Sequence, residues 1–403
     1  MANAFPHADL AAESFEEGLF AETKLCKTCD THYSKDFENV DFAPGDTLRV
    51  VLPPRDSSDM TEGKNLVAEF TEKEVVSVTV QQFNKGRVIS SAEMLLEDRD
   101  FVERVTKPVV QGCSRFVERT GFDTLAEGAS LLHGLASANP SNFRVWAEAQ
   151  AKMRQMLVPS ESGIYGAMDH LTMAGFSDNE KKLFSPKDEV EGMWRKGEVQ
   201  EAANIKFYTS SNINRHTNGD GLCIGPQLSA TPSAGNTVTI DGASSGSTYT
   251  AGSKFKIVGV NACDPESKEA MTWPMWFTLT EDAAIVGAAA TLTFAPALVL
   301  TGSLQNVSVA PVNNDEIEFH GVESTAYIKN LLYDKNAVIM VGLPLPDHGN
   351  QSGKVSRRTF RNVPLRVVNF TDWVGDQNYL RFDTMFGWAV KRFMHIFEIW
   401  QPA

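Results

Sequence analysis

The sequence is short of cysteines and of basic residues. Its 403 residues include 5 cysteines, and 37 lysines and arginines stand against 51 aspartates and glutamates, which gives a net charge of −14. So small and odd a number of cysteines excludes a disulfide scaffold and favours a reducing compartment. The acidic balance argues against a dedicated nucleic-acid-binding protein, which normally carries a basic footprint, and it disfavours anionic membrane surfaces.

Signals for export and membrane insertion are also lacking. The N-terminus carries acidic residues instead of a basic stretch followed by an apolar run, so no secretory signal is predicted. Residues 283–300 are eighteen residues without a charge, which is the length of a spanning helix. However, Gly287 and Pro296 interrupt this segment, and residues 291–294 alternate with period two. The segment therefore favours a strand over a membrane span.

Catalytic motifs are missing as well. The chain has no nucleophile elbow, no phosphate-binding loop and no dinucleotide fingerprint. Its 8 histidines form no pair at helical i, i+4 spacing, and its carboxylates do not cluster as an acid–base pair. We therefore predict no enzymatic activity, no catalytic residue and no cofactor.

The metal candidates are Cys26, Cys29 and His32. A Cys-x-x-Cys pair supplies half of a zinc site, and His32 supplies a third ligand at most. A structural site needs four ligands, and the remaining cysteines are isolated and distant in the sequence. The favoured interpretation is two thiols on a helix of an N-terminal arm, with a metal site as the alternative.

The first half of the chain predicts a projecting hairpin followed by a long helix. Residues 47–52 and 75–80 have strand-like patterns and enclose a long polar stretch, which indicates an extended hairpin. Ser90 and Glu93 fit a capping box, and apolar residues recur at helical spacing over most of 91–119. Pro108 predicts a kink, and two shorter helices are the alternative.

Residues 120–215 are predicted to be rich in helix. One helix is expected to start at Asn139–Pro140, with Trp146 on its apolar face, and another to span 185–197. Short strands are expected at 156–158 and 205–208.

The composition changes at about residue 221. Residues 221–311 contain nine charged residues, whereas Gly, Ser, Thr and Ala are frequent and short apolar alternations recur. This pattern predicts a small antiparallel barrel or sandwich inserted into another domain. After it, a helix is predicted at 327–332, strands at 338–343 and 365–370, and a packed aromatic tail from Tyr379.

One basic run and one polar loop are the candidate contact sites. The run contains Arg357, Arg358 and Arg361, and a solvated loop is its simpler interpretation. Its functional interpretation is a contact with an acidic surface, such as a neighbouring copy of this chain. The loop contributes Arg55, Asp56 and Asp59, chosen for exposure and charge.

Four stretches, taken in order, resemble one known family. They are residues 197–213, 251–265, 305–308 and the C-terminal residues 365–368 with 381–388. Their sequences and order are similar to those of the major capsid (coat) proteins of short-tailed, temperate-type tailed bacteriophages with an inserted β-domain. The resemblance extends from about residue 190 to 395. The N-terminal arm and the Cys26/Cys29 pair have no counterpart in it.

The resemblance implies an α+β tailed-phage capsid fold. It implies a structural protein of the virion that forms pentamers and hexamers and closes into an icosahedral shell around double-stranded DNA. It also implies a scaffolding protein and a portal protein as partners, with a decoration protein left open. The expected parts are an N-terminal arm at 1–45, an extended loop at 46–89, a spine helix and peripheral domain at 90–220, an inserted β-domain at 221–311, and an axial domain with a C-terminal return strand at 312–403.

Two other classes of function remain as alternatives. The first is a virion surface or adhesin-like binding module that uses the inserted β-domain. The second is a metal-dependent enzyme built on Cys26, Cys29 and His32. The shell protein explains the projecting loop, the insert and the missing catalytic groups together.

Overall fold

The computed structural model describes most of the chain outside its N-terminal segment and several loops. The described residues are 23–31, 47–53, 74–90, 107–159, 161–180, 201–221, 225–243, 245–346, 354–360, 363–372, 374–375 and 377–403. They fall into two compact units. The first unit takes residues 1–50, 76–122 and 338–389, and the second takes 51–75, 123–337 and 390–403.

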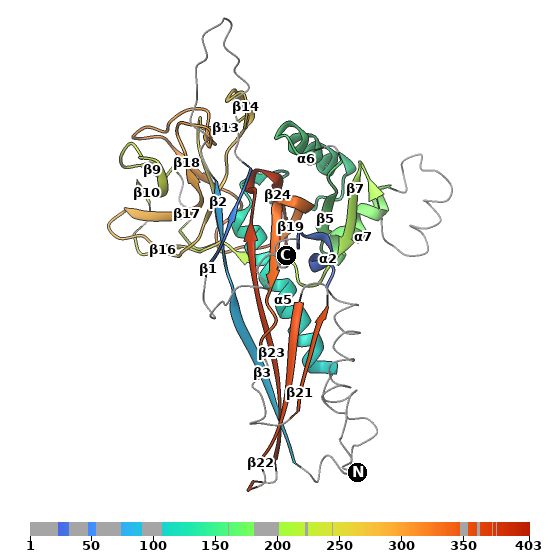
Figure 1. Ribbon diagram of the computed structural model, residues 1–403. Helices are drawn as coiled ribbons and strands as arrows, with labels where there is room; N and C mark the ends of the chain where they lie inside the picture. The colour runs from blue at the N-terminus through green and yellow to red at the C-terminus, as the bar shows by residue number, and fades with distance from the viewer. Residues whose placement is uncertain are drawn as a thin grey trace, which may run out of the picture. The chain divides into compact units, whose positions relative to one another are not determined.

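The first unit is built on a five-stranded sheet (Figure 1). Its central strand, β23 (Gln377–Val390), pairs antiparallel with β22 (Val363–Asp372) and with β3 (Gln81–Ser90). The sheet is completed by β20 (Val338–Gly342) and by β21 (Lys354–Phe360), which pairs with β22. The predicted strands at 338–343 and 365–370 and the packed aromatic tail are therefore confirmed.

A separate two-stranded sheet joins β1 (Thr47–Val51) to β2 (Val75–Thr79). In β1, exposed and buried residues alternate strictly, as the period-two pattern of the sequence predicts. The two strands of the predicted hairpin are thus present. The polar stretch between them, 54–73, lies outside the described residues.

The main helix is α5 (Lys107–Gly128), whose residues up to Phe122 belong to the first unit. Pro108 is its second residue, a position that proline tolerates because the first turn has no intrahelical acceptor for its N–H. The helix continues to Gly128, beyond the predicted end at 119, and residues 91–106 lie outside the described part.

The side chain of Glu118 on α5 holds the short helix α2 (Leu25–Thr28). Its Oε1 accepts the backbone N–H groups of Lys24, at 2.5 Å, and Leu25, at 2.9 Å. A carboxylate suits this position because the first N–H groups of a helix lack intrahelical acceptors. Glu118 is completely buried, so this contact between α5 and α2 lies in the interior of the first unit.

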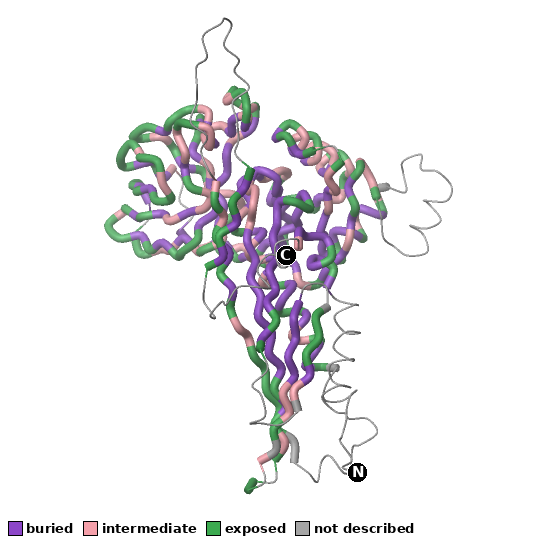
Figure 2. The backbone as a smooth tube through the Cα atoms, viewed as in Figure 1, coloured by how far each residue is buried: buried purple, intermediate pink, exposed green. Residues whose placement is uncertain are grey.

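The second unit contains a seven-stranded mixed sheet. Its centre is β19 (Ala326–Asp334), which pairs antiparallel with β24 (Ile396–Pro402), β5 (Ile164–Met168) and β8 (Arg215–Thr217). Figure 2 shows how completely β19 and β24 are buried. The other strands are β4 (Leu131–Leu132), β7 (Ile205–Thr209) and β6 (Glu201–Ala202), and the unit also has helices α6 (Phe143–Gln155) and α7 (His170–Glu180).

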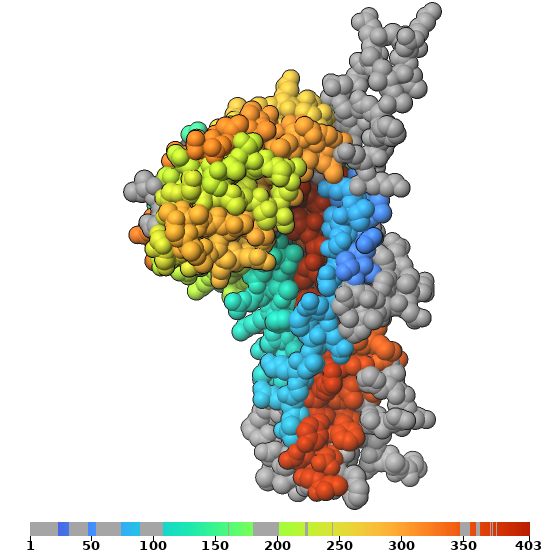
Figure 3. Space-filling view, turned by 90° about the vertical axis from the view of Figure 1, so that its left-hand side faces the viewer, coloured from blue at the N-terminus to red at the C-terminus, as the bar shows by residue number. Residues whose placement is uncertain are grey.

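A second sheet of this unit is formed by chain that lies between β8 and β19. It runs in the order β18 (Ile317–Phe319), β12 (Lys254–Ile257), β15 (Phe277–Leu279), β17 (Ala290–Leu298), β10 (Gly235–Asp241) and β9 (Gln227–Leu228). The same segment also forms two separate two-stranded sheets, β11 (Thr248–Tyr249) with β16 (Ala283–Ala284) and β13 (Asn261–Cys263) with β14 (Ala270–Pro274). In Figure 3 this segment, yellow-green to orange, forms one lobe.

Aromatic rings fill the interior of the lobe. The Phe255 ring lies 5.6 Å from those of Phe277 and Phe294, centroid to centroid. All three side chains are at most 2% exposed, and they come from β12, β15 and β17. The predicted series of short strands at 221–311 is confirmed, including the strand in the uncharged segment 283–300.

Three local predictions differ from the structure, and a fourth lies outside its described residues. The helix predicted at 327–332 is wrong, because these residues lie in β19, and the strand predicted at 156–158 is wrong, because Leu157 adopts a turn with φ of 64°. The helix expected at 139–140 instead begins at Phe143, where the side chain of Asn142 accepts the N–H of Arg144 at 3.1 Å. The helix predicted at 185–197 lies outside the described residues.

Candidate assembly elements

Two of the three metal candidates lie in the described part of the chain. Cys26 and Cys29 are buried free thiols at α2, and Cys29 Sγ donates to the carbonyl of Cys26 at 3.4 Å. His32 lies outside the described residues. Within the described part of the chain, no group of three or more His, Cys, Asp or Glu side chains is placed to hold a metal ion.

The basic run lies on β21, which pairs with β22 in the first unit. Arg357 and Arg358 are exposed, opposite Arg366 and Leu365 respectively. The guanidinium of Arg357 donates to the carbonyl of Leu345 at 3.4 Å. Arg361, Arg55, Asp56 and Asp59 lie outside the described residues. The structure thus places two of the six candidate contact residues, both on an exposed strand.

A buried ion pair between the neighbouring strands β22 and β23 was not predicted. Arg366 is 3% exposed, and its Nε and Nη2 donate to Oδ2 of the fully buried Asp383 at 3.1 and 2.6 Å. Arg381 Nε donates to Oδ1 at 2.6 Å, and Arg366 Nη1 donates to the carbonyl of Pro346 at 2.8 Å. Because Asp383 accepts three charge-assisted hydrogen bonds, the pairing fixes β22 against β23.

The second unit contains a lysine with no exposure to solvent at all. Lys254, the first residue of β12, is 0% exposed, and its ammonium donates to Thr278 Oγ1 at 2.5 Å. It also donates to the carbonyls of Ala126, at 3.3 Å, and Ala129. Cations favour the C-terminal end of a helix because the last carbonyls lack intrahelical donors. Lys254 therefore caps the end of α5 from within the lobe formed by the chain between β8 and β19.

The counter-ion of Lys254 is Glu398 on β24. The two charged groups are 3.5 Å apart, and both side chains are fully buried. The other oxygen of Glu398 accepts the indole N–H of Trp400 at 2.6 Å. Burial lowers the pKa of Lys254 to about 8, although the nearby carboxylate acts in the opposite direction. Strands β12 and β24 and the end of α5 thus meet at one buried charge.

A second buried lysine, Lys329 on β19, lies in the same region. Its ammonium donates to the carbonyl of Gly252 at 2.6 Å and lies 5.0 Å from the centre of the Trp400 ring. Burial lowers its pKa, against the charges of Glu398, Glu127 and Asp123. Burial raises the pKa of Glu127, and Asp123 adds to the increase.

Two histidines complete this buried cluster. Burial lowers the pKa of His216 to about 3, and the charge of Lys329 contributes. Burial also lowers the pKa of His320 to about 4, with Lys254, Lys256 and Lys329 acting in the same direction. Both rings pack edge-on against Trp400, at 5.7 and 5.0 Å between centroids.

These buried charges join β12, β19, β24 and the end of α5 within the second unit, and they are not placed for catalysis. Lys254, Lys329 and Glu398 are at most 2% exposed, and their hydrogen bonds go to backbone carbonyls, Thr278 and Trp400. A general acid or base needs access to a substrate proton, which such burial prevents. Neither Lys254 nor Glu398 could be recognised from the sequence, because their partners are distant along the chain.

The chain matches one family model over nearly its whole length. Residues 3–395 match the model described as "P22 coat protein - gene protein 5". Among curated proteins there is no match.

Solved structures that resemble the chain include capsids at low sequence identity. A chain from Mycobacterium phage Che8 is 10% identical, with a TM-score of 0.49, and the likeness covers 94% of this chain and 91% of that one. A chain of the capsid of the cyanophage P-SCSP1u is 12% identical, with a TM-score of 0.45 and coverages of 90% and 85%. For the virus-like particle from Pyrococcus furiosus the values are 8%, 0.43, 99% and 100%. Because these TM-scores are below 0.5, the assignment depends on the family match.

The chain belongs to the P22 coat protein family. It is a structural protein with the α+β fold of phage capsid proteins: it associates with copies of itself into a phage shell, forms part of the virion and is not an enzyme. The family match does not favour the adhesin-like alternative. Across the described residues, no helix has the length and apolar character needed to cross a membrane.

Proposed function

We propose that this coat protein assembles as pentamers and hexamers into an icosahedral shell that encloses double-stranded DNA. The observation that carries the proposal is the family match, which spans residues 3–395 and so includes both compact units. The net charge of −14 is compatible with this role, because a shell around DNA should bind the phosphate backbone only weakly.

The same proposal assigns a role to each of the expected parts of the chain. The arm at 1–45 and the extended loop at 46–89 contact neighbouring subunits. The inserted β-domain at 221–311 instead packs within its own subunit. A scaffolding protein and a portal protein are the further partners, and a decoration protein remains open. The exposed arginines Arg357 and Arg358 contact an acidic surface of a neighbouring copy.

The test is the structure of the particle. The protein is expressed together with a candidate scaffolding protein, and the particles are imaged by electron cryomicroscopy. The proposal expects icosahedral shells with fivefold and sixfold capsomers of this chain, and DNA inside mature particles that resists nuclease. Open tubes, or shells that contain only one type of ring, would contradict it.

A further inference from the structure

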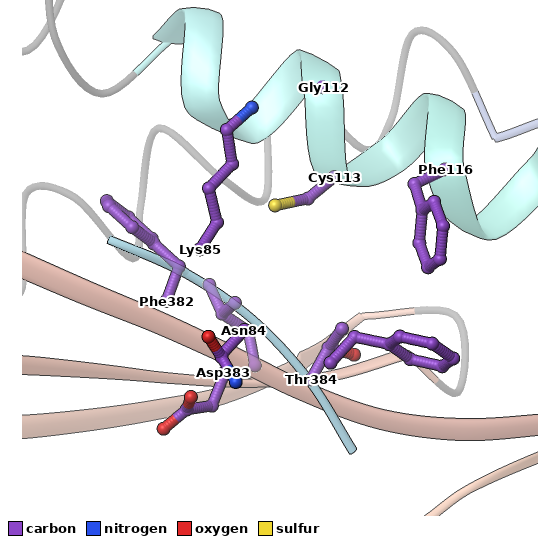
Figure 4. A pocket seen from close by; sticks show the side chains of 10 residues that line it. Asn84, Lys85, Gly112, Cys113, Phe116, Phe382, Asp383 and Thr384 are labelled. Atoms are coloured by element: carbon purple, nitrogen blue, oxygen red, sulfur yellow. The ribbon is translucent and has the colours of Figure 1, made fainter. Parts of the chain in front are cut away.

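A cavity of about 290 Å³ lies between helix α5 and the sheet of the first unit (Figure 4). Gly112, Cys113 and Phe116 line it from the helix, and residues of β3, β22 and β23 line it from the sheet. All of these residues belong to one compact unit. The cavity is close to the small end of the range for ligand pockets, which starts at roughly 300 Å³.

The register of the sheet explains which side chains face the helix. Phe382 is paired with Lys85, and Thr384 with Phe83. Since residues two apart on a strand share a face, these four side chains lie on one face of the sheet. Figure 4 shows Lys85 extending toward Gly112, and a Cβ added at Gly112 would lie 2.9 Å from the Lys85 ammonium.

Aromatic rings form the apolar wall. The rings of Phe83 and Phe116 meet edge-to-face, with 4.8 Å between centroids, and Phe83 also lies 4.9 Å from Phe386. Phe116 is 43% exposed, although it is one of the larger apolar residues of α5. The cavity thus presents aromatic surface that the described part of the chain leaves partly uncovered.

Two polar groups of the cavity, the Thr384 hydroxyl and the Lys85 ammonium, have no partner among the described residues. The hydroxyl of Thr384, a residue 6% exposed, is buried and has no hydrogen-bond partner among the described residues. Such a group normally costs free energy unless a water or ligand satisfies it. Lys85 forms no ion pair with any described residue. Burial raises the pKa of the Cys113 thiol, and the charge of Lys85 acts in the opposite direction. Asp383 is already engaged by Arg366 and Arg381, so it leaves Lys85 unneutralised.

We propose that this cavity binds a small amphipathic anion, with its apolar body against Phe83, Phe116 and Phe382 and its carboxylate at the Lys85 ammonium. The hydroxyl of Thr384 supplies a further donor. A purely apolar ligand would leave Lys85 and Thr384 unsatisfied. A metal cation is excluded, because the one carboxylate in the lining is consumed by two arginines. A nucleotide is disfavoured, because one lysine is too little positive charge for several phosphates.

The test uses the unassembled full-length protein and a matched pair of ligands. These are 4-phenylbutyrate and its neutral analogue 4-phenylbutanol, measured by isothermal titration calorimetry. We expect one site per chain with a Kd on the order of 0.1–1 mM for the anion, given the ligand's size. The alcohol should bind about fivefold more weakly, because an exposed ion pair contributes modestly. Equal affinities for the two ligands, or no saturable site, would overturn the proposal.

Substitutions then locate the site. Lys85→Gln should weaken the anion about fivefold and leave the alcohol unchanged, and Lys206→Gln, an exposed lysine on β7, is the control that should change neither. Thr384→Val keeps the side-chain shape and should also weaken the anion about fivefold through the lost hydrogen bond. If Thr384→Val only raises stability and leaves affinity unaltered, the cavity is a packing defect and the proposal is wrong.

Alkylation of Cys113 gives a readout of position that does not depend on affinity variants. Iodoacetamide is added at pH 9 with and without saturating 4-phenylbutyrate, and peptides are read by mass spectrometry. Cys26, Cys29 and Cys263 are buried, so Cys113 is expected to react before these three. A ligand in the cavity should slow the Cys113 reaction at least threefold, whereas 4-phenylbutanol at the same concentration should protect less. An unchanged rate with bound ligand would place the ligand elsewhere and overturn the proposal.

Discussion

The ammonium of Lys254 lies 3.5 Å from the carboxylate of Glu398, and neither side chain is exposed to solvent. Lys254 starts a strand of the lobe between β8 and β19, whereas Glu398 lies in β24, near the end of the sequence. The same ammonium donates to the backbone of α5 at Ala126 and Ala129. Folding of the lobe and completion of the end of α5 are therefore linked through a single charge.

Removing this charge should destabilise the protein strongly. Lys254→Met keeps the length of the side chain but leaves Glu398 charged, buried and without its cation. Loss of one partner of a buried pair costs about 3–5 kcal/mol. We expect the free energy of unfolding to fall by about 3 kcal/mol, measured by urea denaturation of the unassembled protein with tryptophan fluorescence.

Two further variants test the cause. Lys254→Met combined with Glu398→Gln should recover at least about 1 kcal/mol, because no buried charge is then left unpaired. Lys256→Met is the control. The Lys256 ammonium pairs with Glu318 at 2.6 Å, but both side chains are partly exposed, so the cost should stay below about 1 kcal/mol. Equal losses for the two lysine variants would contradict the assignment.

Acid should destabilise the second unit through its buried histidines. The pKa of His216 is lowered to about 3 and that of His320 to about 4, from 6.5. Between pH 6.5 and these values, each histidine is protonated in the unfolded chain but neutral in the folded one. The free energy of unfolding is therefore highest above pH 6.5 and decreases as the pH falls. Each histidine should account for about 2 kcal/mol of the loss by pH 4.5.

The measurement is urea denaturation of the unassembled protein at pH 7.5, 6.0 and 4.5. His320→Gln should flatten the pH dependence, and so should His216→Gln. The neutral ring of His216 is 3.1 Å from Ser253 Oγ, and glutamine can keep a polar contact there. A variant whose stability falls with acid as steeply as that of the wild type would show that the corresponding histidine titrates normally.

The first unit should depend on the charge of Asp383. Asp383→Asn preserves the shape but removes the negative charge that faces Arg366 and Arg381. Because Arg366 is then a buried cation without a counter-ion, we expect a loss of about 3 kcal/mol. Asp241→Asn on the exposed end of β10 is the matched control and should change stability by less than about 0.5 kcal/mol.

Charge reversal on β21 should act on assembly and not on folding. Arg358 is exposed, so Arg358→Glu should leave the urea midpoint nearly unchanged. If Arg358 contacts an acidic neighbour, the variant should give at least tenfold fewer particles on sedimentation, while Arg358→Lys should assemble normally. Normal particle yield from Arg358→Glu would refute its role in the interface.

The sequence predicts strands best where one face is exposed. The alternation in β1 and the spaced apolar pairs of β10 and β17 identify their elements directly. Residues 327–332 fail because β19 is buried on both faces, so its apolar run lacks the period of two and resembles a buried helix.

Buried charges escape sequence analysis for a different reason. Lys254 stands beside Phe255 in an ordinary strand pattern, and its acceptor at Ala129 lies 125 residues away in sequence. Arg366 likewise extends a visible basic run, yet it pairs with Asp383 on the next strand. Only the three-dimensional pairing of strands distinguishes these buried residues from exposed charges such as Arg358.

The most direct test of the central claim is the state of the protein expressed alone. Light scattering behind size exclusion gives the mass of each species, and negative-stain imaging gives its form. A self-assembling coat protein predicts closed shells, spirals or capsomer rings, with addition of a crowding agent or scaffolding protein increasing their yield. A chain that stays monomeric under all of these conditions would contradict the account.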